Sequence, residues 1–124
     1  MTKQRRRILE ALRLGNDHPS AEELYEQVRR EMPKISLGTI YRNLEVLTAL
    51  GEIQTLSFGS SLKRFDGNPR QHYHIRCLQC ERLADAPVPV AATIDRLVRS
   101  LTDYEVYGHR LEFIGLCPHC RQDR

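Results

Sequence analysis

Residues 72–85 read HYHIRCLQCERLAD and bring two histidines, two cysteines and an aspartate into one short stretch. Side chains two positions apart lie on the same face of a strand, so His72 and His74 can be directed at one point. Cys77 and Cys80 have the C-x-x-C spacing with which a tight turn presents two thiolates to one ion. The stretch therefore predicts a metal-binding segment around which the C-terminal half of the chain folds.

A second cysteine pair, Cys117 and Cys120, repeats this spacing near the C-terminus. Four thiolates complete a closed tetrahedral zinc shell, so we expect a structural zinc ion bound by Cys77, Cys80 and this second pair. The two histidines of the first stretch and Asp85 are then left over. Leftover ligands with harder donor atoms predict a second metal site of a different kind.

The chain has 124 residues, enough for one domain or for two small ones that share an interface. It contains no apolar run of about 18 or more residues, the length that a membrane-spanning helix needs. The N-terminal residues lead into an amphipathic helix without an apolar signal region. We therefore expect a cytoplasmic protein, in which paired cysteines bind metal rather than form disulfides. The net charge of +3 permits nucleic-acid binding but is too small to argue for it alone.

The first half of the chain has the pattern of three short helices. Apolar residues at helical spacing predict helices at 3–14, 20–33 and 36–51. Ser20 and Glu23 have the spacing of a capping box, which marks the start of the second helix. A tight turn between the second and third helices is typical of a helix-turn-helix.

The third predicted helix carries candidate DNA contacts on the face opposite its leucine stripe, including a glycine that permits close approach of the backbone. Two strand-like runs, 52–57 and 62–66, are joined through 59–61 and have the pattern of a wing with basic residues for phosphates. The predicted DNA contacts are Gly38, Thr39, Tyr41, Arg42, Lys63 and Arg64. Two alternatives stay open. Tyr41 could belong to the hydrophobic core and not contact DNA, and the three helices could form a plain core whose charged face is solvated and binds no DNA.

A linker at 67–71 divides the chain into predicted domains at 1–67 and 68–124. The second domain has predicted strands at 73–77, 82–86 and 104–115 and a predicted helix at 90–101. This is a small α+β unit whose exposed sheet edge or helix can pair with a second copy of the chain.

Eight motifs are distributed over nearly the whole chain. They are TKQR at 2–5, HPSA at 18–21, GTIYRNL at 38–44, RFD at 64–66, HYH at 72–74, HRLE at 109–112, and C-x-x-C at 77–80 and 117–120. Together they resemble the ferric uptake regulator (Fur) family of bacterial metal-dependent transcription factors. The resemblance implies an α+β fold with an N-terminal winged helix-turn-helix and a small α/β dimerisation domain that carries the four-cysteine zinc site. It also implies a homodimer that binds a palindromic double-stranded DNA operator when metal is bound.

Within that family the chain resembles the peroxide-sensing (PerR-like) branch. Asp85 stands where iron-sensing relatives tend to carry glutamate, and Tyr73 stands where they commonly carry aspartate. The resemblance implies that Fe(II) or Mn(II) binds a regulatory site, and that with Fe(II) peroxide oxidises His18 or His72 and releases the operator. The implied regulatory ligands are His18, Asp66, His72, His74 and Asp85.

Three other functions were weighed: a different repressor of the same family, a metalloenzyme, and a zinc-ribbon module. A repressor of this family that responds to iron, manganese or zinc would share the architecture without sensing peroxide. A metalloenzyme is disfavoured because no nucleophile or general base accompanies the His/Asp cluster. We therefore expect no enzymatic activity and no small-molecule substrate other than peroxide. A zinc-ribbon module without a DNA role is disfavoured by the motif at 38–44.

Two further histidines and the N-terminus complete the expectations. His119, inside the second cysteine turn, is expected to be solvated, and His109 is expected to be either a ligand or a buried partner behind the ligands. The chain begins at the first motif, without the helix that precedes it in many relatives. Arg5, Arg6 and Arg7 are expected to offset that loss by contacting phosphates.

Overall fold

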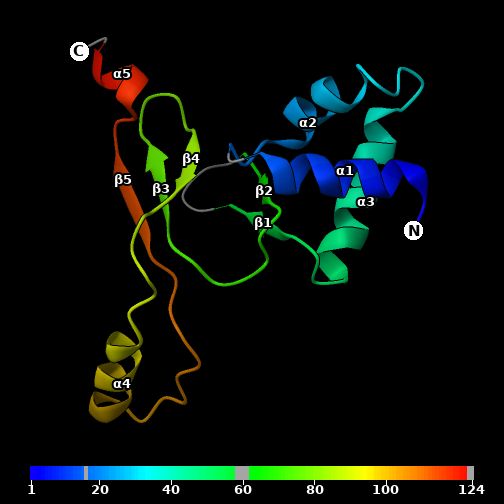
Figure 1. Cartoon of the computed structure of the whole chain (residues 1–124). Helices are drawn as coiled ribbons and strands as arrows, with labels where there is room; N and C mark the ends of the chain where they lie inside the picture. Colours follow the sequence, from blue (N-terminus) through cyan, green and yellow to red (C-terminus); the bar gives the residue numbers. More distant parts are fainter. Residues whose placement is uncertain (16, 58–61, 123–124) are drawn as a thin grey trace.

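The structure, a computed structural model, describes residues 1–15, 17–57 and 62–122. Its N-terminal part consists of helices α1 (Lys3–Leu14), α2 (Ala21–Val28) and α3 (Leu37–Ala49) (Figure 1). Each helix directs its apolar stripe at one shared core, as the helical spacing predicts. The most deeply buried side chains of this core are Ile8, Leu24, Val28, Ile40, Leu44 and Leu47.

Hydrogen bonds at the ends of α2 and α3 fix where these helices begin and end. Ser20 and Glu23 form the predicted capping box: Ser20 Oγ accepts the Glu23 N–H at 3.2 Å, and Glu23 Oε1 accepts the Ser20 N–H at 2.9 Å. Ser36 caps α3 by accepting the Thr39 N–H at 3.1 Å. Gly51 follows the end of α3 at φ +74°, a conformation that glycine adopts without strain.

The helix α2 is shorter than the sequence predicts, because it ends at Val28 and not at Pro33. The carbonyl oxygen of Val28 accepts the N–H groups of both Glu31, at 3.1 Å, and Met32, at 2.9 Å. These bonds close the helix with a tight turn at 29–31. Met32 still packs against the core from the loop that follows.

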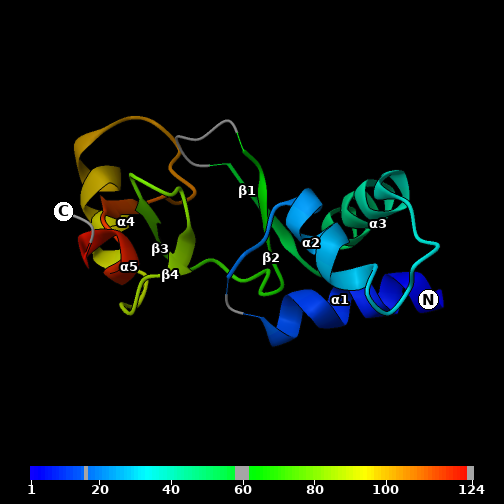
Figure 2. The same cartoon turned by 90° about the horizontal axis from the view of Figure 1, so that it is seen from above.

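Strands β1 (Gln54–Leu56) and β2 (Arg64–Asp66) pair antiparallel, with Thr55 opposite Phe65, and form the predicted wing. The predicted turn at 59–61 lies outside the described residues. Phe65 is buried in the helical core, which anchors the wing to the helices. In both views the wing lies between the three helices and the C-terminal sheet (Figures 1 and 2).

The C-terminal sheet has three strands in the order β4-β3-β5. The strands are β3 (His74–Cys77), β4 (Leu83–Asp85) and β5 (Glu112–Gly115). The first two pair antiparallel around the cysteine turn, and β5 pairs parallel to β3. The predicted strand at 104–115 is wrong over most of its length, because β3 offers partners only to Glu112–Gly115.

Two helices lie beyond opposite ends of this sheet, α4 (Ala92–Leu101) at one end and α5 (Pro118–Gln122) at the other (Figure 1). The short α5 was not predicted, since five residues carry too little periodicity to reveal a helix. No residue of α4 is buried, and its apolar side chains are 40–77% exposed. These side chains are Ile94, Leu97, Val98 and Leu101. Within the described ranges, the helices lack the length and apolar character that crossing a membrane requires.

Candidate metal centres

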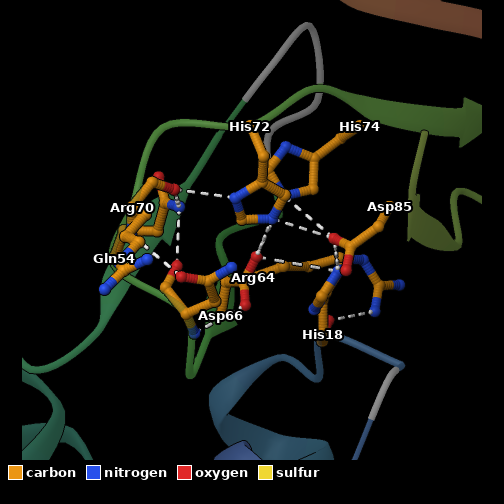
Figure 3. Close-up of polar contacts among 9 residues, drawn as sticks. His18, Gln54, Arg64, Asp66, Arg70, His72, His74 and Asp85 are labelled. Atoms are coloured by element: carbon orange, nitrogen blue, oxygen red, sulfur yellow. Dashed lines mark hydrogen bonds and ion pairs between the residues drawn. The ribbon is translucent and has the colours of Figure 1, made fainter. Parts of the chain in front are cut away.

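Three imidazoles and two carboxylates meet where the wing faces the C-terminal sheet (Figure 3). His18 lies in the turn before α2, and Asp66 ends β2. His74 begins β3, His72 lies two positions before it, and Asp85 ends β4. Antiparallel pairing sets His74 opposite Asp85. All five residues predicted for the regulatory site are therefore brought together from both halves of the chain.

The ring nitrogens of these histidines point at two carboxylate oxygens. Oδ2 of Asp66 lies 2.8 Å from Nε2 of His72, 3.0 Å from that of His74 and 3.7 Å from that of His18. Oδ1 of Asp85 lies 2.8 Å from Nε2 of His18, 2.9 Å from that of His72 and 3.6 Å from that of His74. Each Nε2 atom faces both carboxylates, so all five groups are directed at one small volume.

Burial differs across the site. The side chains of His18 and Asp66 are 5% exposed and that of His74 is 1% exposed, whereas His72 is 19% and Asp85 is 52% exposed. A cavity of about 620 Å³ borders His72 on one side. A smaller cavity of about 240 Å³ borders His18 and the two aspartates on the other. Small molecules therefore have two approaches to the ligands.

The electrostatics of the site favour charged carboxylates beside imidazoles. Burial acts to raise the pKa of Asp66, but hydrogen bonds from His74 and the Asn68 N–H, with the charges of the neighbouring imidazoles, lower it overall. Burial acts to lower the pKa of His72, but a hydrogen bond with the Arg70 carbonyl and the charges of the two aspartates raise it overall. These nitrogen and oxygen donors, without sulfur, fit Fe(II) or Mn(II) and also accept zinc.

The four cysteines form the second cluster, with sulfur atoms that all lie within 4.8 Å of one another. Cys77 ends β3, Cys80 lies in the turn that follows, and Cys117 and Cys120 lie at the start of α5 and within it. Backbone N–H groups of Cys80 and Cys117 lower the pKa of Cys77 to about 5, while burial and the neighbouring thiols raise the pKa of Cys120 to about 12. One divalent cation would allow all four thiols to ionise, so this cluster fits tetrahedral zinc.

Most of the predicted DNA contacts lie on accessible surface. Gly38, Tyr41 and Arg42 are exposed on α3, Thr39 is partly exposed, and Lys63 is exposed on the wing. Tyr41 is 40% exposed and donates its hydroxyl hydrogen to the carboxylate of Glu22 at 2.5 Å. The alternative in which Tyr41 belongs to the core is therefore wrong.

The structure buries Arg64, so we leave this residue out of the proposed DNA contacts. Its guanidinium is buried and donates to the carbonyl oxygen of His18 at 3.2 Å and to Oε1 of Glu23 at 3.0 Å. A guanidinium bound in this way does not reach a phosphate. In sequence Lys63 and Arg64 look alike, but all three residues of β2 are buried, so the alternation expected of a wing strand does not apply.

A hydrogen-bonded chain also links α4 to Tyr73, and of its members sequence reasoning singled out only His109, as either a ligand or a buried partner. Nδ1 of His109 lies 2.7 Å from Oδ1 of Asp95 on α4, and Nε2 of His109 is hydrogen-bonded to the hydroxyl of Tyr73. The same hydroxyl accepts the Ala91 N–H at 2.9 Å. His109 is thus a partner that connects α4 with β3 and lies outside both ligand clusters. The HRLE motif was the only signal for it, whereas His119 is exposed on α5 as expected.

Comparison with known proteins gives consistent results. Residues 1–114 match the sequence profile of the ferric uptake regulator family. The peroxide-responsive repressor PerR of Staphylococcus aureus is 40% identical over 121 residues, which are 98% of this chain and 82% of that protein. A zinc-bound manganese uptake regulator is 31% identical, with a TM-score of 0.76 over 94% of this chain and 89% of that one. The Helicobacter pylori ferric uptake regulator Fur shares the fold, with a TM-score of 0.83, 24% identity and coverage of 98% of this chain and 81% of that one.

Proposed function

This chain belongs to the ferric uptake regulator family of metal-dependent regulators, and from that premise we propose that it is a DNA-binding repressor inactivated by peroxide. The Staphylococcus aureus relative carries the name of a peroxide-responsive repressor, which supports this signal. The relatives are regulators rather than enzymes, so we propose no catalytic role.

One observation carries the proposal: the imidazoles and carboxylates of the regulatory site come from both halves of the chain. His18 belongs to the helical half, and Asp85 belongs to the C-terminal sheet, yet their side chains lie 2.8 Å apart. A cation bound here favours the arrangement in which the two halves are joined. That arrangement sets the distance between the recognition helices of a dimer, so metal binding and DNA binding are coupled.

We assign a structural Zn(II) to the four cysteines, and Fe(II) or Mn(II) to the regulatory ligands His18, Asp66, His72, His74 and Asp85. Fe(II) held there would supply the redox chemistry by which hydrogen peroxide oxidises an adjacent imidazole. In the net reaction one peroxide oxygen would be inserted into a ring C–H bond and the other would leave as water, with no net loss of electrons from the ion.

The two candidate targets are His18 and His72, each of which borders a cavity. An oxidised ring is a poor ligand, and both candidates supply their Nε2 atom to the site. Loss of either bond removes a contact that joins the wing and α2 to the sheet. The two halves then separate and the operator is released.

For DNA binding we propose that α3 enters the major groove through Gly38, Thr39, Tyr41 and Arg42, with Lys63 on a phosphate. Domains at 1–67 and 68–124 would then carry DNA binding and dimerisation.

Two copies related by a two-fold axis require a palindromic operator. The exposed apolar face of α4 and the free edge of β5 supply the dimer surface. The cytoplasm is the compartment that offers both DNA and reducing conditions for the cysteines.

The test is operator binding measured by fluorescence anisotropy, with a duplex selected from random sequences by the Mn(II)-loaded protein. Zinc-loaded protein receives Fe(II) or Mn(II) without oxygen and is measured before and after micromolar peroxide. Mass spectrometry then reads the peptides that carry His18 and His72. We expect binding to be lost only in the Fe(II) form, with one added oxygen atom on either histidine.

Binding that survives peroxide, with both histidines unmodified, would contradict peroxide sensing. A regulator that responds to metal alone would then remain, as the similarity to the manganese uptake regulator allows. His74→Ala serves as the control for the site, because it removes a buried ligand and retains both candidate oxidation targets, His18 and His72. This variant is expected to lose metal-dependent operator binding.

A further inference from the structure

Arg64 is a charged side chain buried at the junction of the wing and the start of α2. Only 8% of its surface is exposed. Burying a guanidinium is costly unless its donors are satisfied, so such a residue is expected to have a defined role in the structure. It is not among the proposed DNA contacts, so its role is sought among its partners.

Those partners are the backbone of one regulatory ligand and the cap of a helix. Nη1 of Arg64 donates to the carbonyl oxygen of His18 at 3.2 Å (Figure 3). It also donates to Oε1 of Glu23 at 3.0 Å. The same carboxylate oxygen of Glu23 accepts the Ser20 N–H in the capping box. One guanidinium therefore connects His18 to the N-terminus of α2.

His18 needs such a connection because its backbone is unusual. Its φ is +44°, in the left-handed region that residues other than glycine seldom adopt. Backbones of this kind persist only where their surroundings hold them. Two hydrogen bonds from β2 hold this segment. Besides the bond from Arg64 to the His18 carbonyl, the Phe65 N–H donates to the Pro19 carbonyl at 3.0 Å.

Strand β2 thus contacts the regulatory site in two ways. Asp66 supplies a carboxylate that lies 3.7 Å from Nε2 of His18. Arg64, two positions earlier in the same strand, holds the backbone carbonyl of His18. Movement of β2 would displace both the carboxylate and the imidazole that faces it.

We propose that Arg64 is a positioning residue for the regulatory metal site, which holds His18 in its left-handed conformation so that Nε2 faces the carboxylates. This inference rests on the proposed function, because it takes His18 to be a ligand of the regulatory ion. Arg64 acts through His18 and does not bind the ion itself.

The test is a double-mutant cycle on Mn(II) affinity, measured in zinc-loaded protein from the free Mn(II) signal in electron paramagnetic resonance. The variants are His18→Ala, Arg64→Met and the double variant. Arg64→Met is expected to weaken Mn(II) binding about tenfold, a typical effect of losing a group that orients a ligand. In the His18→Ala background the same substitution is expected to change the affinity less than twofold. Arg30→Met, at an exposed arginine outside both ligand clusters and outside the proposed DNA contacts, is the matched control and is expected to leave the affinity unchanged.

Arg64→Lys provides both a rescue and a safeguard against a variant that does not fold. A lysine donates to one acceptor at a time, so its Mn(II) affinity is expected to lie between those of the wild type and Arg64→Met. Should Arg64→Met fail to fold, the cycle is run with Arg64→Lys. Zinc content and the thermal midpoint of the zinc-loaded form are measured for every variant.

Equal losses of affinity in both backgrounds would overturn the inference, because Arg64 would then support the fold in general and not His18. Unchanged affinity in Arg64→Met, or in Arg64→Lys where Arg64→Met does not fold, would overturn it as well, while the proposed function would stand. If His18→Ala itself leaves Mn(II) affinity unchanged, the regulatory site assigned under the proposed function fails, and the inference fails with it.

Discussion

At the scale of single residues, Asp66 and Gly67 at the end of β2 join the regulatory site, the start of the linker and helix α1. One carboxylate oxygen faces the imidazoles of His72 and His74, and the other accepts the Asn68 N–H at 2.9 Å. The next residue, Gly67, lies against the backbone of α1. A Cβ atom at Gly67 would lie 2.8 Å from the carbonyl carbon and oxygen of Leu12. The absence of a side chain at Gly67 therefore lets α1 pack beside the ligand-bearing end of β2.

Gly67→Ala is expected to destabilise the protein by about 2 kcal/mol, because the new methyl group meets rigid backbone atoms that cannot move aside. Urea unfolding of the zinc-loaded protein measures the free energy of unfolding. Gly108→Ala is the matched control, since a Cβ atom there would meet nothing within 4 Å. A Gly67→Ala variant as stable as this control would show that the close approach to α1 is not maintained in solution.

Much of the regulatory site could be predicted at this scale, but the reasons differ from residue to residue. The residue pattern alone pointed to His72, His74 and Asp85 as ligands of a second metal, whereas His18 and Asp66 rested on the family resemblance. The antiparallel register explains Asp85 afterwards, since it lies opposite His74. The role of Arg64 could not be predicted, because Lys63 and Arg64 are adjacent basic residues and the sequence does not show which of the two is buried.

At the scale of elements, α3 was the most predictable part. Its apolar residues recur at helical spacing and are buried, and Ser36 and Gly51 mark its ends in sequence as in the structure. Elements that depend on tertiary partners were predicted less well. The strand expected at 104–115 exists only where β3 provides hydrogen-bond partners, and α5 is too short for any periodicity.

Arg42→Ala tests the role of α3, because Arg42 is exposed on the face opposite the buried stripe. Loss of one arginine contact to a base or phosphate is expected to weaken operator binding about tenfold or more. Fluorescence anisotropy with the selected duplex measures the effect, and zinc content and dimerisation are expected to stay unchanged. Glu45→Ala, also exposed on α3, is the control and should not weaken binding. Equal affinity for Arg42→Ala and wild type would argue that α3 does not enter the groove.

At the scale of the whole molecule, the two halves differ in how much apolar surface they bury. The helical half encloses its core, whereas α4 and the edge strand β5 leave large apolar side chains exposed, among them Leu101 at 77% and Ile114 at 59%. Exposed apolar surface of this extent marks an interaction site. In the dimer that we propose, a second copy of the chain covers this surface.

Leu97→Glu is expected to convert the dimer into monomers, because it introduces a charge into an apolar interface where Leu97 is 61% exposed in the single chain. Sedimentation velocity measures the mass in solution, and operator affinity should fall in parallel. Arg96→Glu, on the same helix outside the apolar face, also introduces a negative charge and is expected to leave the dimer intact. A Leu97→Glu protein that remains dimeric would exclude α4 from the interface.

The contact between His18 and Asp85 joins residues 67 positions apart in sequence. An ion held between them acts as a removable crosslink that closes a long loop, so its stabilisation includes the lost entropy of the open chain. With the crosslink present, the helical half and the sheet should unfold as one cooperative unit. Without it, the covalent connection between them is the 67–71 linker, and each half is expected to unfold at its own temperature.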